Sequence, residues 1–181
     1  TMFQVIPKKC RGAKVSFFLV VGIIFRTFLY RYYDIYKIAE RLKIWWGNNV
    51  SINKVQNIIS NTGAHEYYET YKKYEQLYWI HIPMWILEYA KNNKVNKCLD
   101  IGFAYGTLLL FTQLNTKCTS YGIDFLKYSS DDLLIKYNIK RETLNIETQN
   151  VDKYKNKIDI LILTEVMEHL NYNPILTLKK I

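Results

Sequence analysis

Residues Val95 to Gly106 read Val-Asn-Lys-Cys-Leu-Asp-Ile-Gly-Phe-Ala-Tyr-Gly, and the apolar segment Thr-Leu-Leu-Leu-Phe follows them. A short apolar run ends in Asp100, and a turn with Gly102 and Gly106 then opens a helix-like segment. This order of strand, glycine-containing loop and helix is typical of a nucleotide-binding α/β unit, where glycine lets a ligand approach the backbone closely. The stretch therefore predicts an α/β fold with a binding loop after Asp100.

The acid at Asp100 narrows the class of ligand. A loop that binds phosphate needs positive potential from backbone N–H groups and a helix N-terminus. A carboxylate beside that loop would repel pyrophosphate, but it suits a ligand with a cationic amine. S-adenosylmethionine carries an amine and a sulfonium and has no phosphate.

Two later segments agree with this interpretation. Thr119–Phe125 reads as a strand that ends in Asp124, about 20 residues after the loop, which is the spacing of a carboxylate that binds ribose hydroxyls. Ile158–Thr164 is a nearly continuous apolar run, as expected for a parallel strand buried on both faces. We expect neighbouring parallel strands, the first of them central, with right-handed crossovers and helices on both faces. Their approximate ranges are 96–101, 119–124, 142–146 and 158–164.

These residues resemble the class I S-adenosylmethionine-dependent methyltransferases. The first motif of that family is an apolar strand followed by Asp/Glu-x-Gly-x-Gly-x-Gly, and Leu99–Gly106 matches it except that Ala104 replaces the middle glycine. The segment Glu165–Leu170 is similar to the Glu-Val-x-Glu-His-Leu that follows the fourth strand in many small-molecule members. The resemblance implies a Rossmann-like parallel sheet and S-adenosyl-L-methionine as cofactor.

The resemblance also assigns roles to residues. Asp124 would bind the ribose, and Asn145 takes the place of an acid that contacts adenine, so that it keeps an acceptor but loses the charge. The acceptor-side residues would be Glu165, Glu168 and His169. The residues implied in cofactor binding are Asp100, Gly102, Ala104, Tyr105, Gly106, Asp124, Phe125, Asn145, Ile146 and Thr164.

The same segment raises the question of a metal site. Its residues Glu165, Glu168 and His169 are also similar to a segment of quinone-biosynthesis O-methyltransferases, some of which use a divalent ion. Two carboxylates and an imidazole could hold a metal at an acceptor hydroxyl. The same segment is common in the family as helix-start and core structure, so we predict no metal.

The same residues also fit other interpretations. Asp100 and Asp124 could cap the helices that follow them. A dinucleotide-binding oxidoreductase is disfavoured because Gly102-x-x-x-Gly106 lacks the Gly-x-Gly-x-x-Gly pattern. An Asn-Pro-Pro-Tyr type of motif is absent after the fourth predicted strand, which argues against DNA adenine as acceptor. A non-catalytic module with this fold, acting in interaction or at a membrane, is the main alternative.

Composition sets the remaining bounds. The 181 residues suffice for one domain with a substantial core, and the hydrophobic content of 49% is that of a globular chain. Three unpatterned cysteines indicate neither a disulfide framework nor a zinc site, and a reducing cytoplasm fits. The net charge of +9 reflects scattered lysines, so it does not predict a specific nucleic-acid partner.

The N-terminal half reads as a helical, aromatic lead-in over 1–94, before the α/β domain of 95–181. An apolar run ends at Arg26 and is too short to span a membrane, and within 15–33 it suits either a helix on a membrane surface or a buried helix. Such contact would make the cytoplasmic protein membrane-associated. The chain ends after four recognisable strands, so we expect it to be a fragment whose C-terminal strands are missing.

Within the lead-in, Ser51 is a candidate cap for a helix that begins near Ile52, and 61–63 should break that helix. Pro83 should end or kink one helix and start the next. Tyrosines at 67, 71, 74 and 78 share one helical face, and we expect this stripe to be mainly core. Tyr71, Tyr74 and His81 are also candidates for the acceptor pocket. The predicted function is methyl transfer to a small-molecule or lipid-linked acceptor.

Overall fold

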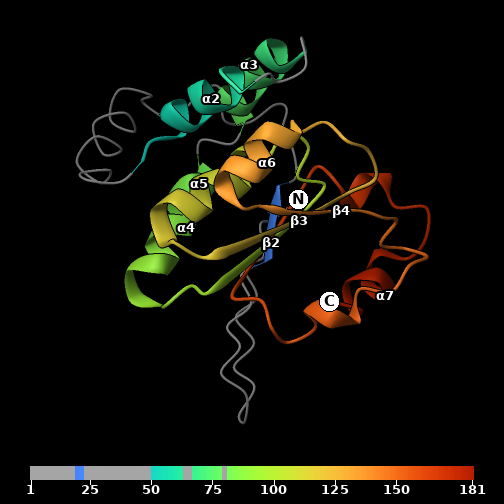
Figure 1. Cartoon of the computed structure of the whole chain (residues 1–181). Coiled ribbons are helices and arrows are strands. Elements are labelled where there is room, and N and C mark those ends of the chain that lie inside the picture. Colours follow the sequence, from blue (N-terminus) through green and yellow to red (C-terminus); the bar gives the residue numbers. More distant parts are fainter. Residues whose placement is uncertain (1–18, 23–49, 63–66, 79–80) are drawn as a thin grey trace, which may run out of the picture.

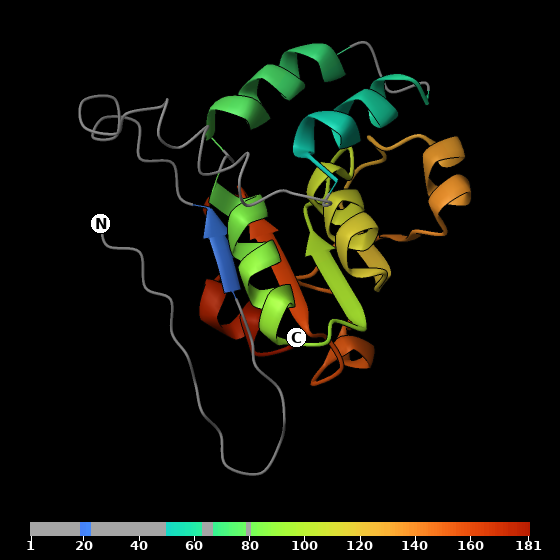
Figure 2. The same ribbon diagram turned by 90° about the vertical axis from the view of Figure 1, so that its left-hand side faces the viewer.

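The computed structural model describes residues 19–22, 50–62, 67–78 and 81–181. Within these ranges the chain forms a five-stranded sheet in the order β1-β5-β2-β3-β4, and every neighbouring pair is parallel. Figure 2 shows β1, β5 and β2 side by side, with their arrowheads pointing the same way. The strand bounds are β1 Leu19–Gly22, β2 Lys97–Ile101, β3 Thr119–Asp124, β4 Lys140–Thr143 and β5 Ile160–Thr164.

The predicted α/β fold with a parallel sheet is confirmed. Strand β2, which precedes the glycine loop, lies between β3 and β5, so that Leu99 pairs with Tyr121 on one side and Leu161 on the other. Strand β4 ends at Thr143, earlier than the predicted 142–146. The chain leaves the sheet there because Asn145 forms a turn, in which its side-chain oxygen accepts the N–H of Glu147 at 2.8 Å.

Helices cover both faces of the sheet. On one face, residues of α2, α4, α5 and α6 pack around the sheet residues Cys98, Ile160 and Ile162. On the other face, Tyr154 and Ile181 pack against Leu99 and Leu163. Figure 1 shows α4, α5 and α6 on one side of the sheet and α7 on the other. The helix bounds are α2 Ile52–Ser60, α3 Tyr68–Tyr78, α4 His81–Asn92, α5 Thr107–Thr116, α6 Asp131–Tyr137 and α7 Pro174–Leu178.

Local sequence signals set several helix ends. The Ser51 hydroxyl accepts the N–H of Lys54 at 3.2 Å, and α2 begins at the next residue, which confirms the predicted cap. Helix α2 ends at Ser60, as expected from the break at 61–63. Pro83 lies in the first turn of α4, where its missing N–H costs no helical hydrogen bond.

Strand β1 corrects part of the expectation for the N-terminal apolar run. Residues 19–22 form a parallel strand beside β5, with Leu19 opposite Leu161, and are therefore not helical. The consecutive valines Val20 and Val21 favour an extended backbone, and pairing with β5 satisfies the backbone polar groups that face that strand. The rest of 15–33 lies outside the described residues. No helix in the described ranges is long and apolar enough to cross a membrane.

The predicted tyrosine stripe is wrong at Tyr67, whereas Tyr71 packs against the core as expected. Tyr67 is 65% exposed and precedes α3, whereas Tyr68 is 1% exposed and packs in the core. The hydroxyl of Tyr68 lies 3.3 Å from the hydroxyl of Thr107 at the start of α5, so this helix face is anchored to the sheet domain. The inward face of α3 therefore carries positions 68, 71 and 75, which are spaced three and four residues apart.

Candidate functional site

A cavity of about 720 Å³ lies at the carboxyl ends of the parallel strands. It is bordered by residues that follow β2, β3, β4 and β5, together with Tyr71 of α3. The chain runs outward from β2 to β3 and β4 and then returns to place β5 on the other side of β2. Ligands of open α/β sheets bind where the strand order reverses in this way. The size lies within the range of small-molecule sites, about 300–1,000 Å³.

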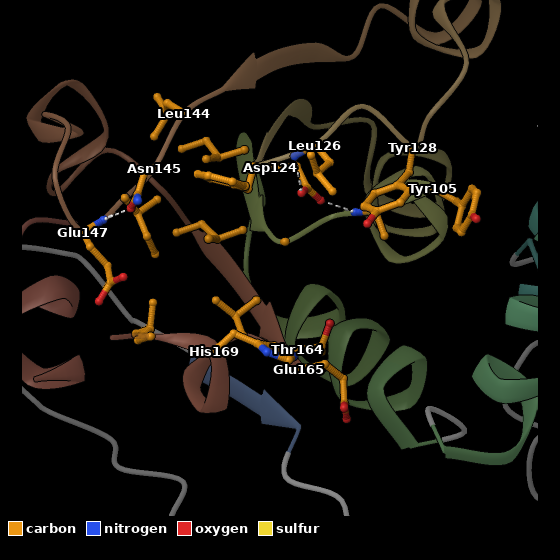
Figure 3. Close-up of a pocket in the computed structure, with 18 of the residues that line it drawn as sticks. Tyr105, Asp124, Leu126, Tyr128, Leu144, Asn145, Glu147, Thr164, Glu165 and His169 are labelled. Atoms are coloured by element: carbon orange, nitrogen blue, oxygen red, sulfur yellow. Dashed lines mark hydrogen bonds between the residues drawn. The ribbon is translucent and has the colours of Figure 1, made fainter. Parts of the chain in front are cut away.

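Most of the residues predicted for the site line this cavity. Tyr105, Asp124 and Asn145 lie along it, and Thr164, Glu165 and His169 lie on the opposite wall (Figure 3). The other predicted residues among its lining are Gly102, Ala104, Phe125 and Ile146. Asp100, Gly106 and Glu168 do not line it. Tyr71, one of three further candidates, belongs to the lining, whereas Tyr74 and His81 do not.

Asp124 joins two loops at the mouth of the cavity. Its Oδ2 accepts the backbone N–H of Ala104 at 2.8 Å, and its Oδ1 accepts the N–H of Leu126 at 3.1 Å (Figure 3). Each carboxylate oxygen has a further lone pair, so these bonds leave acceptor capacity toward the cavity. The carboxylate is thus oriented before a ligand arrives.

The glycine loop has an unusual backbone. Gly102 and Ala104 have φ angles of 73° and 45°, so alanine stands in the left-handed region that favours glycine. A Cβ on Gly102 would lie 2.3 Å from Cγ2 of Val166, so the glycine makes room for the segment after β5. From the sequence we expected this glycine to leave space for a ligand. The structure shows that it also leaves space for the Val166 side chain.

Asp100 belongs to β2, just before the glycine loop, and is 2% exposed. Its Oδ1 has no hydrogen-bond partner among the described residues. Burial, the Asp124 carboxylate and then Glu75 raise the pKa of Asp100 well above the ordinary range of an aspartate. A buried acceptor without a donor is costly, so this oxygen is suited to a donor that a ligand brings.

Asn145 and Glu147 form the wall beyond β4. The side-chain oxygen of Asn145, the expected adenine contact, already accepts the N–H of Glu147. The Glu147 carboxylate accepts the N–H of Tyr172 at 2.7 Å and the side-chain amide of Asn171 at 3.1 Å. Glu147 therefore ties the segment after β5 to the loop after β4 across the cavity.

Glu165 follows β5 with a φ of 54°, a strained angle for a glutamate. Its carboxylate accepts a hydrogen bond of 3.3 Å from the Tyr74 hydroxyl of α3. Burial and the neighbouring Glu168 raise the pKa of Glu165, which favours proton exchange nearer to neutral pH. Glu168 and His169 are exposed in a 3₁₀ helix, Met167–His169. No group of residues suited to holding a metal occurs in the described ranges.

The charge of the cavity is opposite to that of the chain. Its lining includes the acids Asp124, Glu147 and Glu165, and none of its described lining residues is lysine or arginine. The whole chain nevertheless carries a net charge of +9. The site therefore suits a cationic or neutral ligand better than a phosphate.

Several residues in and around the site had not been predicted. Glu75 does not line the cavity but is buried on α3 and accepts a hydrogen bond from the Gln56 amide, and a lone glutamate in a tyrosine-rich helix gives no clear sequence signal. Tyr128 lines the cavity and contacts the Tyr105 ring at 5.8 Å between centroids. A Cβ on Gly122 would lie 2.8 Å from the ring of Phe103, and a glycine inside a strand is a signal of such close approach.

Comparison with known proteins gives little further guidance. No family model matches the sequence, and no curated protein matches it. Among solved structures, the chain is similar to the plantazolicin methyltransferase BpumL, whose structure is a complex with a monoazolic desmethylPZN analog and SAH. The TM-score is 0.39 with 16% identity, and the similarity covers 80% of this chain and 56% of the other. The chain thus spans a little over half the length of that protein.

Proposed function

We propose that this chain binds S-adenosylmethionine in the cavity and transfers its methyl group to a small-molecule or lipid-linked acceptor. The observation that carries the proposal is the pair of acids around the glycine loop. Asp124 holds the loop by accepting the N–H of Ala104. The buried Asp100, in β2 just before the loop, has one oxygen without a hydrogen-bond partner among the described residues. This arrangement offers acceptors to hydroxyls and an ammonium group, and it does not offer a cation to phosphate.

The lining of the cavity fits the parts of such a ligand. Apolar surface at the ends of β3 and β4 suits an adenine ring and is supplied by Ile123, Leu144 and Ile146. Asp124 lies between that surface and the glycine loop and can accept from ribose hydroxyls. The Asp100 carboxyl suits the ammonium group at the amino-acid end of S-adenosylmethionine.

When bound, S-adenosylmethionine supplies an electrophilic methyl group on a sulfonium sulfur. The chain contributes mainly position, because holding the acceptor in line with that methyl converts a bimolecular encounter into a local step. Glu165 stands on the opposite wall from Asp124 and, with its raised pKa, could take a proton from an acceptor that must lose one. Tyr74 holds this carboxylate through its hydroxyl.

The proposed acceptor class rests on the rim of the cavity. Phe125 is 66% exposed, and the neighbouring Leu126 and Tyr128 are also exposed large hydrophobic residues of the lining. Exposed apolar side chains at the mouth of a site favour an acceptor with apolar or aromatic parts. A small molecule or a lipid-linked group has such parts.

A non-catalytic module remains the second candidate. Two observations favour it: the strained Ala104 at the position of the middle glycine, and the Asn145 oxygen that is already bonded to the backbone of Glu147. Both could weaken cofactor binding relative to a glycine and a free acid.

Titration calorimetry of the full chain distinguishes the candidates. Binding of S-adenosylmethionine and S-adenosylhomocysteine, without comparable binding of ATP or NADH, supports the methyltransferase proposal. Failure of both adenosyl ligands to bind would leave the non-catalytic module. Tighter binding of NADH would overturn the interpretation of the acids.

A further inference from the structure

The inward face of α3 carries a buried acid. Tyr68, Tyr71 and Glu75 lie three and four residues apart, and Glu75 is only 3% exposed. Tyr68 anchors this face to Thr107 at the start of α5, directly after the glycine loop. Glu75 therefore lies on the same inward face of α3 as the tyrosine that contacts the start of α5.

The hydrogen bonds of Glu75 are incomplete. Its Oε2 accepts the side-chain amide of the fully buried Gln56 of α2 at 2.8 Å. The Gln56 oxygen in turn accepts from Gln76 at 2.9 Å, so the glutamine is held in this orientation. Oε1 of Glu75 has no hydrogen-bond partner in the described part of the chain. If Glu75 served only to bridge α2 and α3, this second oxygen would gain nothing from burial.

Glu75 and Asp100 have a common neighbour in Tyr71. Burial is the main cause that raises the pKa of the Tyr71 phenol, and both carboxyls raise it further. Tyr71 itself lines the cavity. The Tyr71 ring packs against the Tyr105 ring of the glycine loop at 5.0 Å between centroids. Burial raises the pKa of Tyr105, and Glu75 contributes to this rise. Two buried carboxyls from separate elements thus share a neighbour in the wall of the cavity, and each has one oxygen without a donor.

No positive side chain forms an ion pair with either acid among the described residues. Lys72 lowers the pKa of Glu75 slightly without forming an ion pair with it, because the Lys72 ammonium lies beside Asn57 and Glu69. The Gln56 amide and the Thr107 hydroxyl also lower the pKa of Glu75, but burial outweighs them. Burying two like charges without a cation is strongly unfavourable. A ligand that brings a cation with several N–H donors would relieve both acids at once.

We propose that Glu75 acts with Asp100 to bind the primary ammonium group at the amino-acid end of the ligand, so that α3 is part of the cofactor site. This inference rests on the proposed function, because S-adenosylmethionine and S-adenosylhomocysteine both carry this ammonium. It assigns to the lead-in helix a binding role beyond covering the core.

The test compares ligands with and without the ammonium in calorimetry of the full chain at pH 7. S-adenosylhomocysteine and decarboxylated S-adenosylmethionine contain the ammonium, whereas 5′-methylthioadenosine lacks it. Glu75→Gln should weaken the first two about tenfold to a hundredfold, the loss expected for a charged hydrogen bond, and leave the third unchanged. Glu88→Gln on the exposed face of α4 is the matched control and should change none of them.

Proton linkage gives a second readout. Burial raises the pKa of Glu75 to about 7, so an arriving ammonium should displace a proton from the pair. The binding enthalpy of S-adenosylhomocysteine should then depend on the ionisation enthalpy of the buffer in the parent and less so in Glu75→Gln. Equal weakening of all three ligands, or an unchanged affinity, would overturn the role of Glu75 alone. No binding of any of them to the parent would overturn the proposed function as well.

Discussion

The backbone N–H of Ala104 lies 2.8 Å from Oδ2 of Asp124, and this bond joins the loop after β2 to the end of β3. The two residues are 20 positions apart in sequence, and the parallel register brings Ile101 opposite Ile123 just before them. One carboxylate therefore both shapes the loop and faces the cavity. If a ligand binds to Asp124 as proposed, its binding is coupled to the order of this loop.

Replacement of Asp124 with alanine should weaken S-adenosylhomocysteine binding by one to two orders of magnitude. The variant loses the proposed acceptor for ribose hydroxyls, and charge-assisted bonds contribute about 1.5–3 kcal/mol each. It also frees the Ala104 N–H, so the loop should exchange amide hydrogen faster. Calorimetry measures the first effect and hydrogen exchange the second.

Asp132→Asn, on the exposed first turn of α6, is the control for Asp124 and should change neither measurement. If Asp124→Ala bound S-adenosylhomocysteine as tightly as the parent, Asp124 would be a brace for the loop only. The ribose assignment would then have to move to another residue.

Ala104→Gly should stabilise the protein by about 0.5–1 kcal/mol, because alanine has a φ of 45° there and glycine adopts this region without strain. Chemical denaturation measures the change in the free energy of unfolding. The same substitution at Ala90, inside α4, should destabilise by a similar amount, since glycine is unfavourable in a helix. A destabilised Ala104→Gly would show that the loop needs the methyl group for packing.

Much of the sheet could be predicted because its signals are local. The acids at Asp100 and Asp124 directly follow short apolar runs, and parallel pairing then brings the strand ends to one edge. The cap at Ser51 depends on neighbours three residues away, which the sequence shows. Features of this kind depend on spacing and residue type alone.

Other parts depend on contacts that spacing does not reveal. Glu75 becomes a buried acid only because α3 turns the 68–71–75 face inward, and the tyrosine pattern, which included position 67, did not indicate position 75. Strand β1 forms because β5 offers a free edge to residues far away in sequence. The bond from Tyr74 to Glu165 spans 91 positions and likewise requires the tertiary fold.

Gly102→Ala should destabilise the protein by about 1–3 kcal/mol. A methyl group there would lie 2.3 Å from Cγ2 of Val166, and alanine would also be strained at a φ of 73°. Because the steric part comes from one side chain, Val166→Ala should restore part of the loss in the double variant. A double-mutant cycle in denaturation experiments should give a coupling of about 1 kcal/mol, whereas strict additivity would place the cost in the backbone alone.

The stability of the protein should depend on pH through Glu75. Its pKa rises on folding from 4.5 to about 7, mainly because of burial. Between these values the folded state binds more protons than the unfolded state, so stability should fall as pH rises from about 4.5 to about 7. The loss is complete above the folded pKa and amounts to as much as about 3 kcal/mol, at about 1.4 kcal/mol for each unit of pKa.

Glu75→Gln removes this proton and should flatten the decline, whereas the control Glu88→Gln should leave it unchanged. Asp100, whose pKa is also raised by burial, should leave a residual decline in Glu75→Gln. Urea denaturation at pH 5, 6, 7 and 8 measures the slope directly, and the slope does not depend on any constant packing cost of the substitution. An identical slope in the parent and Glu75→Gln would show that Glu75 is ionised in the folded state across this range and that burial does not raise its pKa on folding.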